Sequence, residues 1–115
     1  MTAAAADDAL WAAIGDPTRR RVLDVLLARG EATATALAEQ LPVTRQAVAK
    51  HLGVLRRVGL VADRRDGREV IFAVRPDRLA QASQAMAAAA AAWDQRLDAI
   101  KRLAEAAHAA AEAEQ

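Results

Sequence analysis

The chain has 115 residues, enough for one domain, and 33 of them are alanine, which favours helix but buries little area per residue. The absence of cysteine excludes disulfides, thiolate metal sites and cysteine nucleophiles. The net charge of +1 is unevenly distributed, because residues 15–75 hold 12 Arg or Lys residues against 7 Asp or Glu residues. The thin core predicts a homodimer, and the basic middle with its acidic flanks predicts a nucleic-acid partner.

Neither a leader nor a membrane span is expected. Residues 1–6 lack a basic region followed by an apolar run, and the alanine tract near Met86 is too short and too weakly apolar to cross a bilayer. We therefore expect a cytoplasmic protein with no membrane contact.

Two helices are predicted before the centre of the chain. Residues 7–14 form a short helical candidate with apolar residues on one side. Asp16 can cap a helix over residues 17–29, since Pro17 fits its first position and Gly30 can end it.

A helix-turn-helix is predicted over residues 34–57. Thr33 can cap a helix over residues 34–41, which Pro42 ends. Thr44 can cap a second helix that runs to about Arg57. Apolar residues recur on the inward face of this second helix at helical spacing: Val48, Leu52 and Leu55. Two helices joined by so short a connection are typical of a DNA-binding helix-turn-helix.

A β-hairpin is predicted over residues 61–74, with strands at 61–65 and 69–74 and a tight turn at Asp66-Gly67. Three arginines flank the tip, and strand alternation sends them to different sides. Arg68, followed by Arg65, is the candidate for contact with phosphates or the minor groove. One of Arg64 and Arg65 is expected to be a solvated charge on the edge strand.

A long helix is predicted over residues 76–105. Its larger side chains repeat every seven positions, at Leu79, Met86, Trp93 and Ile100, and Leu97 fills in between them. This pattern predicts a helix that pairs with itself or serves as a scaffold. Residues 106–115 lack large apolar anchors, so we expect them to fray.

The outward side of the second helix of the pair carries side chains suited to reading DNA. Arg45 and Lys50 can donate to guanine, Gln46 can pair with adenine, and the small Ala49 permits close approach to a thymine methyl. Thr44 is expected to meet a phosphate. The predicted DNA contacts are thus Thr44, Arg45, Gln46, Ala49, Lys50, Arg65 and Arg68. An ordinary solvated helix face is the alternative for any one residue.

A second basic cluster, residues 19–21, is interpreted as surface or salt-bridge residues, with a phosphate contact as the second interpretation.

These motifs together resemble those of the ArsR family of winged-helix repressors. The segments that carry the resemblance are Gly15-Asp16-Pro17-Thr18-Arg19-Arg20-Arg21, Leu37-Ala38-Glu39, Val48 to Leu55 with His51-Leu52, and Gly59-Leu60-Val61. The resemblance covers about residues 10–93. It implies a mainly α winged helix-turn-helix with a small β-hairpin as wing and the Thr44-capped helix in the major groove, and the chain length predicts one such domain over residues 1–115. It also implies a homodimer through the first and last helices, at about 7–14 and 76–105. The dimer-interface candidates are Leu10, Trp11, Leu79, Met86, Trp93, Leu97 and Ile100.

The sequence departs from the metal-sensing members of that family. It lacks their cysteines and the Asp, His and Glu ligands of their last helix, and neither His51 nor His108 has a partner at ligand spacing. We therefore predict no metal and no cofactor.

Trp11 and Trp93 are interpreted as packing residues, and the alternative is that they line a pocket for a small apolar ligand at the dimer interface.

The leading functional hypothesis is a sequence-specific transcriptional regulator, a repressor, that binds double-stranded DNA. The alternative is an architectural or weakly specific DNA-binding protein, for which a basic face suffices. A protein-interaction module built on the alanine-rich helix is a third reading, against which the basic middle argues. An enzyme is excluded, because the sequence offers no Ser-His-Asp set, Gly-rich phosphate loop or metal triad.

Overall fold

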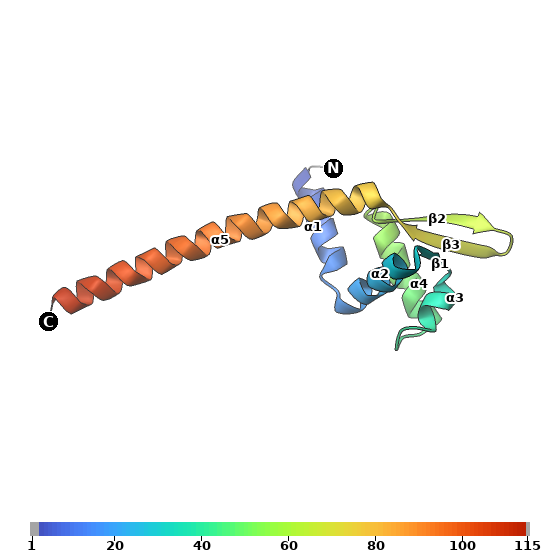
Figure 1. Ribbon diagram of the computed structural model, residues 1–115, viewed down its shortest axis with the longest axis horizontal. Coiled ribbons are helices and arrows are strands. Elements are labelled where there is room, and N and C mark those ends of the chain that lie inside the picture. The colour runs from blue at the N-terminus through green and yellow to red at the C-terminus, as the bar shows by residue number, and fades with distance from the viewer. Residues whose placement is uncertain (1–2, 115) are drawn as a thin grey trace. The chain divides into compact units, whose positions relative to one another are not determined.

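The computed structural model describes the backbone of residues 3–114 and the side chains of residues 8–114. The elements are α1 (Ala3–Ile14), α2 (Pro17–Arg29), β1 (Glu31–Ala32), α3 (Ala34–Ala38), α4 (Arg45–Arg57), β2 (Val61–Asp66), β3 (Glu69–Val74) and α5 (Pro76–Ala113) (Figure 1). Contacts divide the chain after Ala82 into two units, which we call the winged unit and the helical unit. A single domain over residues 1–115 stays a prediction. Residues 1, 2 and 115 and the side chains of residues 3–7 lie outside the described part.

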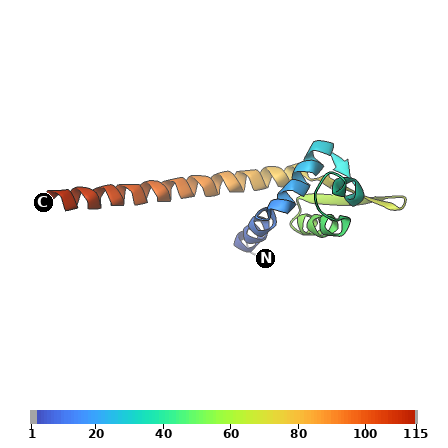
Figure 2. The ribbon, with the colours of Figure 1, turned by 90° about the horizontal axis from the view of Figure 1, so that it is seen from below.

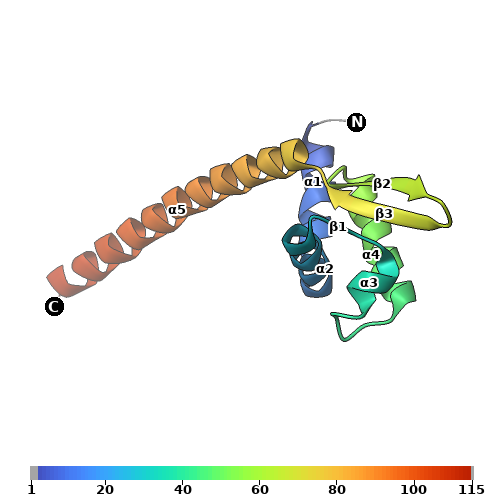
Figure 3. The ribbon, with the colours of Figure 1, turned by 45° about the vertical axis from the view of Figure 1, so that its right-hand side comes forward.

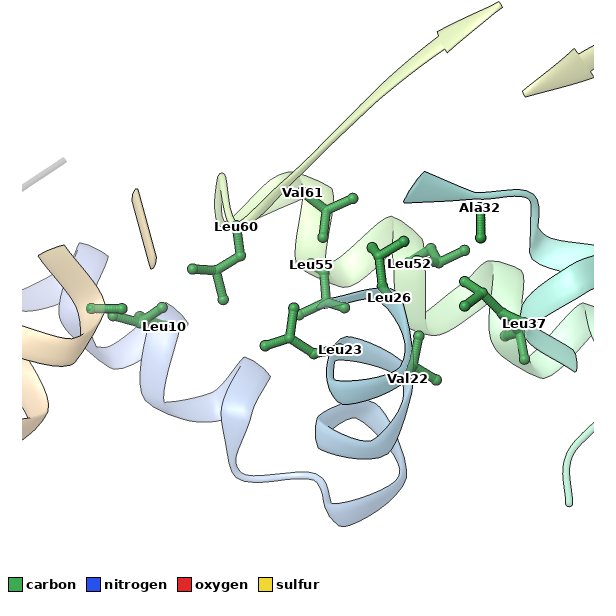
Figure 4. Packing of buried hydrophobic residues seen from close by; sticks show 12 residues of the cluster. Leu10, Val22, Leu23, Leu26, Ala32, Leu37, Leu52, Leu55, Leu60 and Val61 are labelled. Carbon is green, nitrogen blue, oxygen red and sulfur yellow. The ribbon is translucent and has the colours of Figure 1, made fainter. Parts of the chain in front are cut away.

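The core of the winged unit is built from the apolar faces of its helices and the base of its sheet. The fully buried side chains recur at helical spacing on α2 and α4, which explains why both helices persist although neither is long. Figure 4 shows these side chains converging between the helices. The larger core residues are Leu10, Val22, Leu23, Leu26, Leu37, Val48, Leu52, Leu55, Leu60 and Val61.

Helix α2 begins and ends at the residues that the sequence predicts. The Asp16 carboxylate accepts hydrogen bonds from the backbone N–H groups of Thr18 (2.9 Å) and Arg19 (3.1 Å). At the other end Gly30 has a φ of 84°, and its N–H donates to the Leu26 carbonyl at 2.9 Å. Both helix ends are therefore capped by residues of the chain itself.

Stability at acid pH is expected to depend on the Asp16 cap. The hydrogen bond from the Arg19 N–H holds the pKa of Asp16 below its ordinary value of 3.8, helped by the Thr18 N–H and opposed by desolvation. A depressed folded-state pKa means that the charged cap stabilises the fold above the unfolded-state pKa and that this contribution is lost as pH falls through the folded-state pKa. Asp16→Asn keeps the acceptor but cannot titrate. The stability difference between wild type and Asp16→Asn should therefore shrink between about pH 5 and pH 2, as measured by urea unfolding at each pH; a constant difference would contradict this role.

Helix α3 ends at Ala38, three residues before the predicted end. The N–H groups of Gln40 and Leu41 donate to carbonyls only three residues back, at Leu37 (3.1 Å) and Ala38 (3.4 Å). The last turn is therefore tightened, and Pro42 disfavours the helical conformation of the residue before it. The connection to α4 is longer than the sequence suggested.

The sheet contains a third strand that the sequence analysis did not predict. Its order is β1-β3-β2, all antiparallel, and β1 pairs Glu31 with Ala73 and Ala32 with Phe72. The hairpin loop is Gly67-Arg68, one residue later than predicted, because Asp66 still pairs with Glu69. Gly67 has a φ of 63°, which suits glycine at the first position of a two-residue hairpin loop. In all three views the hairpin tip extends beyond the helices of the winged unit (Figures 1, 2 and 3).

Helix α5 continues without a break to Ala113, so the expected fraying from residue 106 is not observed. Alanine has the highest helix propensity, and a pair four residues apart, His108 and Glu112, lies at 3.1 Å on the last turns. The helical unit is thus a single helix. Five large apolar side chains are exposed along it: Met86, Trp93, Leu97, Ile100 and Leu103.

Candidate nucleic-acid interface

Helix α4 is strongly two-sided. Its apolar residues Val48, Leu52 and Leu55 are completely buried. Gln46 and Lys50 are exposed and, at 100° per residue, lie on the far side of the helix from that apolar face. Arg45 and Ala49 are also exposed, but they lie nearer the boundary between the two faces. The prediction that all four point directly away from the core is thus refined: two point outward and two flank the core face.

Arg57 belongs to the same outward side, although the sequence analysis did not include it. It lies seven residues after Lys50, and its guanidinium lies over Gly53, 3.8 Å from the place where a side chain at that glycine would begin. Because seven residues bring a helix back to nearly the same face, this spacing was the signal available in the sequence.

Thr44 is the N-cap of α4. Its hydroxyl oxygen accepts a hydrogen bond from the Ala47 N–H at 3.1 Å, so the hydroxyl proton is free to donate outward. The first backbone N–H groups of α4 face the same end, where the helix dipole favours an anion. The structure therefore places Thr44 where a phosphate contact is chemically reasonable.

The three arginines of the hairpin have different surroundings. Arg64 makes a bidentate bridge to Glu31 of β1, at 2.7 and 3.2 Å. This hydrogen-bonded pair lowers the pKa of Glu31 and raises that of Arg64, so both stay charged. Arg65 and Arg68 are exposed and make no ion pair with the described residues. Arg64 therefore has a structural role, and the side chains of Arg65 and Arg68 are accessible to a ligand.

An open cleft of about 620 Å³ separates α3 and α4 from the hairpin. Arg45, Ala49 and Arg68, three of the predicted DNA contacts, line it together with carboxylates and a further arginine, Arg56. Arg56 pairs with Asp63 of β2 at 3.1 Å and so ties α4 to the hairpin. Sequence reasoning missed Arg56, although it lies seven residues after Ala49 and hence on the same helix face. The fold thus joins the edge of α4 and the hairpin into one surface.

The basic cluster at residues 19–21 is largely structural. Arg19 donates to the carbonyls of Ala12 (3.3 Å) and Ala13 (2.9 Å), and Arg20 donates to that of Ile14 (2.9 Å). These are the unpaired carbonyls at the end of α1, where a cation also complements the helix dipole. Arg19 also lies 3.9 Å from the Asp16 carboxylate, in line with the salt-bridge interpretation. A phosphate contact by this cluster stays the second interpretation.

The predicted interface residues fall into two groups. Leu10 is only 1% exposed and lies in the core of the winged unit, which Leu79 also contacts, and Trp11 is half-buried. Leu10 is therefore corrected to a core residue. Met86, Trp93, Leu97 and Ile100 are exposed on the helical unit, and the Arg96 guanidinium lies 5.1 Å from the centre of the Trp93 ring.

The described part of the chain has neither a cluster of metal ligands nor a helix suited to a membrane. Residues 8–114 contain no group of three or more Asp, Glu or His side chains that could hold a metal ion. No helix within residues 3–114 is long and apolar enough to cross a membrane. His108 lies beside Glu112 as described above, and the buried Nδ1 of His51 has no hydrogen-bond partner among the described residues.

Comparisons with known proteins agree with this geometry. A family model described as a helix-turn-helix domain matches residues 14–64. The uncharacterized HTH-type transcriptional regulator YuzN of Bacillus subtilis is 46% identical over 67 residues, which cover 53% of this chain and 73% of the relative. The transcriptional repressor SdpR of the same organism is 34% identical over 65 residues, covering 56% and 71%. A solved ArsR-like transcriptional regulator from Rhodococcus sp. RHA1 is 38% identical, with a TM-score of 0.67 over 86% of this chain and 92% of that one.

A helix-turn-helix followed by a β-hairpin, with an exposed polar helix side beside that hairpin, defines a winged helix-turn-helix DNA-binding protein. The expected fold class is therefore confirmed. The chain belongs to the ArsR family of transcriptional regulators, as its motifs indicated. These are DNA-binding proteins without enzymatic activity, so the expectation that the chain is not an enzyme is also confirmed.

Proposed function

We propose that the protein is a sequence-specific repressor that acts in the cytoplasm by occupying a promoter as a homodimer. The observation that carries this proposal is the two-sided character of α4, whose outer residues Gln46 and Lys50 are exposed while its inner residues are completely buried. The similarity to the transcriptional repressor SdpR supports repression over activation.

In this proposal α4 enters the major groove. Lys50 and Arg45 donate to the O6 and N7 atoms of guanine, Gln46 pairs with the edge of adenine, and Ala49 allows close contact with a thymine methyl. Thr44 donates to a phosphate, and Arg65 and Arg68 bind the backbone or the minor groove beside it. The cleft between α4 and the hairpin suits the strand that passes between these two contacts.

The homodimer is proposed to form through the exposed apolar stripe of the helical unit. Met86, Trp93, Leu97 and Ile100 fall within a sector of about 60° on an ideal helix. Such a stripe, exposed in one copy, is typical of a surface that a second copy covers. A dimer presents two α4 helices, so the expected operator is a pseudo-palindrome with half-sites about one helical turn apart. A small apolar ligand at the dimer interface stays a prediction.

Selection of bound fragments from random duplex DNA, followed by binding measurements on two variants, tests the proposed specificity. Gln46→Ala should lose about 1–3 kcal/mol of discrimination at one or two base pairs, because it removes a base contact. Arg68→Ala should weaken binding to all sequences alike and reduce the salt dependence by about one phosphate contact. If Gln46→Ala instead weakens all duplexes equally and no consensus emerges, the architectural alternative is correct.

A further inference from the structure

An exposed ion pair lines the cleft between α4 and the hairpin. Nη1 of Arg56 on α4 donates to Oδ2 of Asp63 on β2 at 3.1 Å, and both residues line the cleft. The Arg56 side chain is 55% exposed, whereas that of Asp63 is 31% exposed. The guanidinium therefore offers more of its surface to a ligand than the carboxylate does.

Most of the hydrogen-bonding capacity of Arg56 is unused. A guanidinium has five N–H donors in a planar fork, and among the described residues Arg56 donates only to Asp63. Arg64, by contrast, binds both carboxylate oxygens of Glu31 through both of its Nη atoms. The remaining donors of Arg56 can form the paired hydrogen bonds with which arginine binds phosphate. Because Asp63 already limits the motion of this long side chain, less conformational freedom is lost when a ligand binds.

Helix geometry aligns Arg56 with two of the proposed DNA contacts. Arg45, Ala49 and Arg56 all line the cleft, and on an ideal helix they fall within a sector of about 40°. Arg45 and Arg56 lie about 17 Å apart along the helix axis, at 1.5 Å per residue. The small Ala49 lies between them, and Arg68 lines the cleft from the hairpin. The edge of α4 that faces the cleft thus carries a guanidinium at each end.

The charge of the cleft is balanced. Three arginines and three carboxylates line it: Arg45, Arg56, Arg68, Glu39, Asp63 and Glu69. A surface without net charge does not draw in a polyanion by its general field, so a phosphate there has to be held by a directed contact. An oriented guanidinium with unused donors is such a contact.

We infer that Arg56 binds a phosphate of the DNA backbone and that Asp63 orients its guanidinium for this contact. The inference rests on the proposed function, in which the edge of α4 and the hairpin meet the same duplex. Phosphates carry no sequence information, so Arg56 adds affinity on every duplex. Its role thus differs from the base reading proposed for Gln46 and Lys50.

The test titrates full-length wild type and Arg56→Ala with two duplexes of equal length, one carrying a selected half-site and one of unrelated sequence, at several salt concentrations. Arg56→Ala should weaken binding to both duplexes by about tenfold, because a charge-assisted contact is lost. The slope of log K against log salt concentration should fall by about 0.9, the value for one phosphate. Arg56→Gln removes the same charge with a smaller loss of volume, and it serves in the same way if Arg56→Ala does not fold. An unchanged salt slope overturns the role of Arg56.

Asp63→Ala separates phosphate binding from a purely structural role of the pair. It breaks the same ion pair but leaves the guanidinium, so it should keep the wild-type salt slope and stay within about threefold of the wild-type affinity. If the pair serves only to hold the hairpin against α4, Asp63→Ala and Arg56→Ala should weaken binding alike, and that result also overturns the inference.

A matched control removes an arginine of the winged unit outside the cleft. Arg75 is 48% exposed and pairs with Asp77 at 3.4 Å. Arg75→Ala should therefore keep both the affinities and the salt slope of wild type. A selection that yields no preferred half-site overturns the proposed sequence-specific function, whereas the duplex of unrelated sequence still tests Arg56 in that case.

Discussion

Trp93→Glu is expected to dissociate the dimer and to weaken binding to the two-half-site operator by about 10²–10⁴-fold. Trp93 is 57% exposed and lies in the middle of the apolar stripe, so a second copy would bury it. A carboxylate there would have to be desolvated without a partner, and twofold symmetry would bring in a second one. Loss of the dimer removes the benefit of binding two half-sites at once, whereas affinity for a single half-site should not change.

A control on the opposite side of the same helix separates this effect from a general effect of charge. Ala91 is exposed and lies about 160° around the helix from Trp93. Ala91→Glu should therefore remain dimeric and bind the operator as wild type does. Sedimentation at micromolar concentration gives the oligomeric state, and titration of both duplexes gives the affinities. A Trp93→Glu protein that is still dimeric would show that the stripe is not the interface.

Leu52→Ala should destabilise the protein by about 2–5 kcal/mol, the usual cost of truncating a fully buried leucine. Leu52 is 0% exposed and anchors the inner side of α4 to α2 and the sheet (Figure 4). Because this alanine-rich chain has few large core residues, the loss is a substantial part of a typical domain stability. The side of α4 that is proposed to read DNA depends on that anchoring, so operator binding should fall as well.

The matched control is Leu27→Ala, the same substitution at a leucine of α2 that is 46% exposed. Leu27→Ala should lower the free energy of unfolding by well under half as much as Leu52→Ala, because it removes less buried apolar area from the protein interior. Urea unfolding measured at one fixed protein concentration gives both values, since the stability of a dimer depends on concentration. A cost below about 1 kcal/mol for Leu52→Ala would show that the site can collapse around the smaller side chain.

Helices α2 and α4 could be predicted from local signals alone. Asp16 and Thr44 are good N-cap residues, Gly30 tolerates the positive φ that ends α2, and the inner residues of α4 repeat at helical spacing. These signals act within one or two turns of chain, so a single sequence contains them in full. The outward position of Gln46 and Lys50 followed from the same periodicity.

Features that depend on distant residues were not predictable. Strand β1 has two residues, too few for any alternation, and exists because it pairs with Phe72 and Ala73 on β3. Its Glu31 binds Arg64, 33 residues away in the sequence, which decided which hairpin arginine is structural. The assignment of Leu10 to the interface failed for the same reason, because a lone apolar face on a short helix does not reveal what covers it.

The candidate site was partly predictable. Thr44, Gln46 and Lys50 could be chosen from helix geometry and donor chemistry, and Arg68 from its place at the hairpin tip. The cleft beside α4 and its Arg56–Asp63 pair required the packing of β2 against α4, which no local pattern encodes. Tertiary contacts therefore decided how the predicted residues share one surface.

The short strand β1 has a consequence for how the hairpin meets its target. Pairing with β1 secures β3 near the base of the hairpin and the Glu31–Arg64 bridge secures β2 at mid-length, while Gly67 and Arg68 form the loop at the tip. A loop secured in this way loses little freedom on capture of a ligand, and such preorganisation mainly slows escape of the bound partner. The lifetime of the complex with DNA, more than its rate of formation, should therefore depend on Glu31 and Ala32, the two residues of β1.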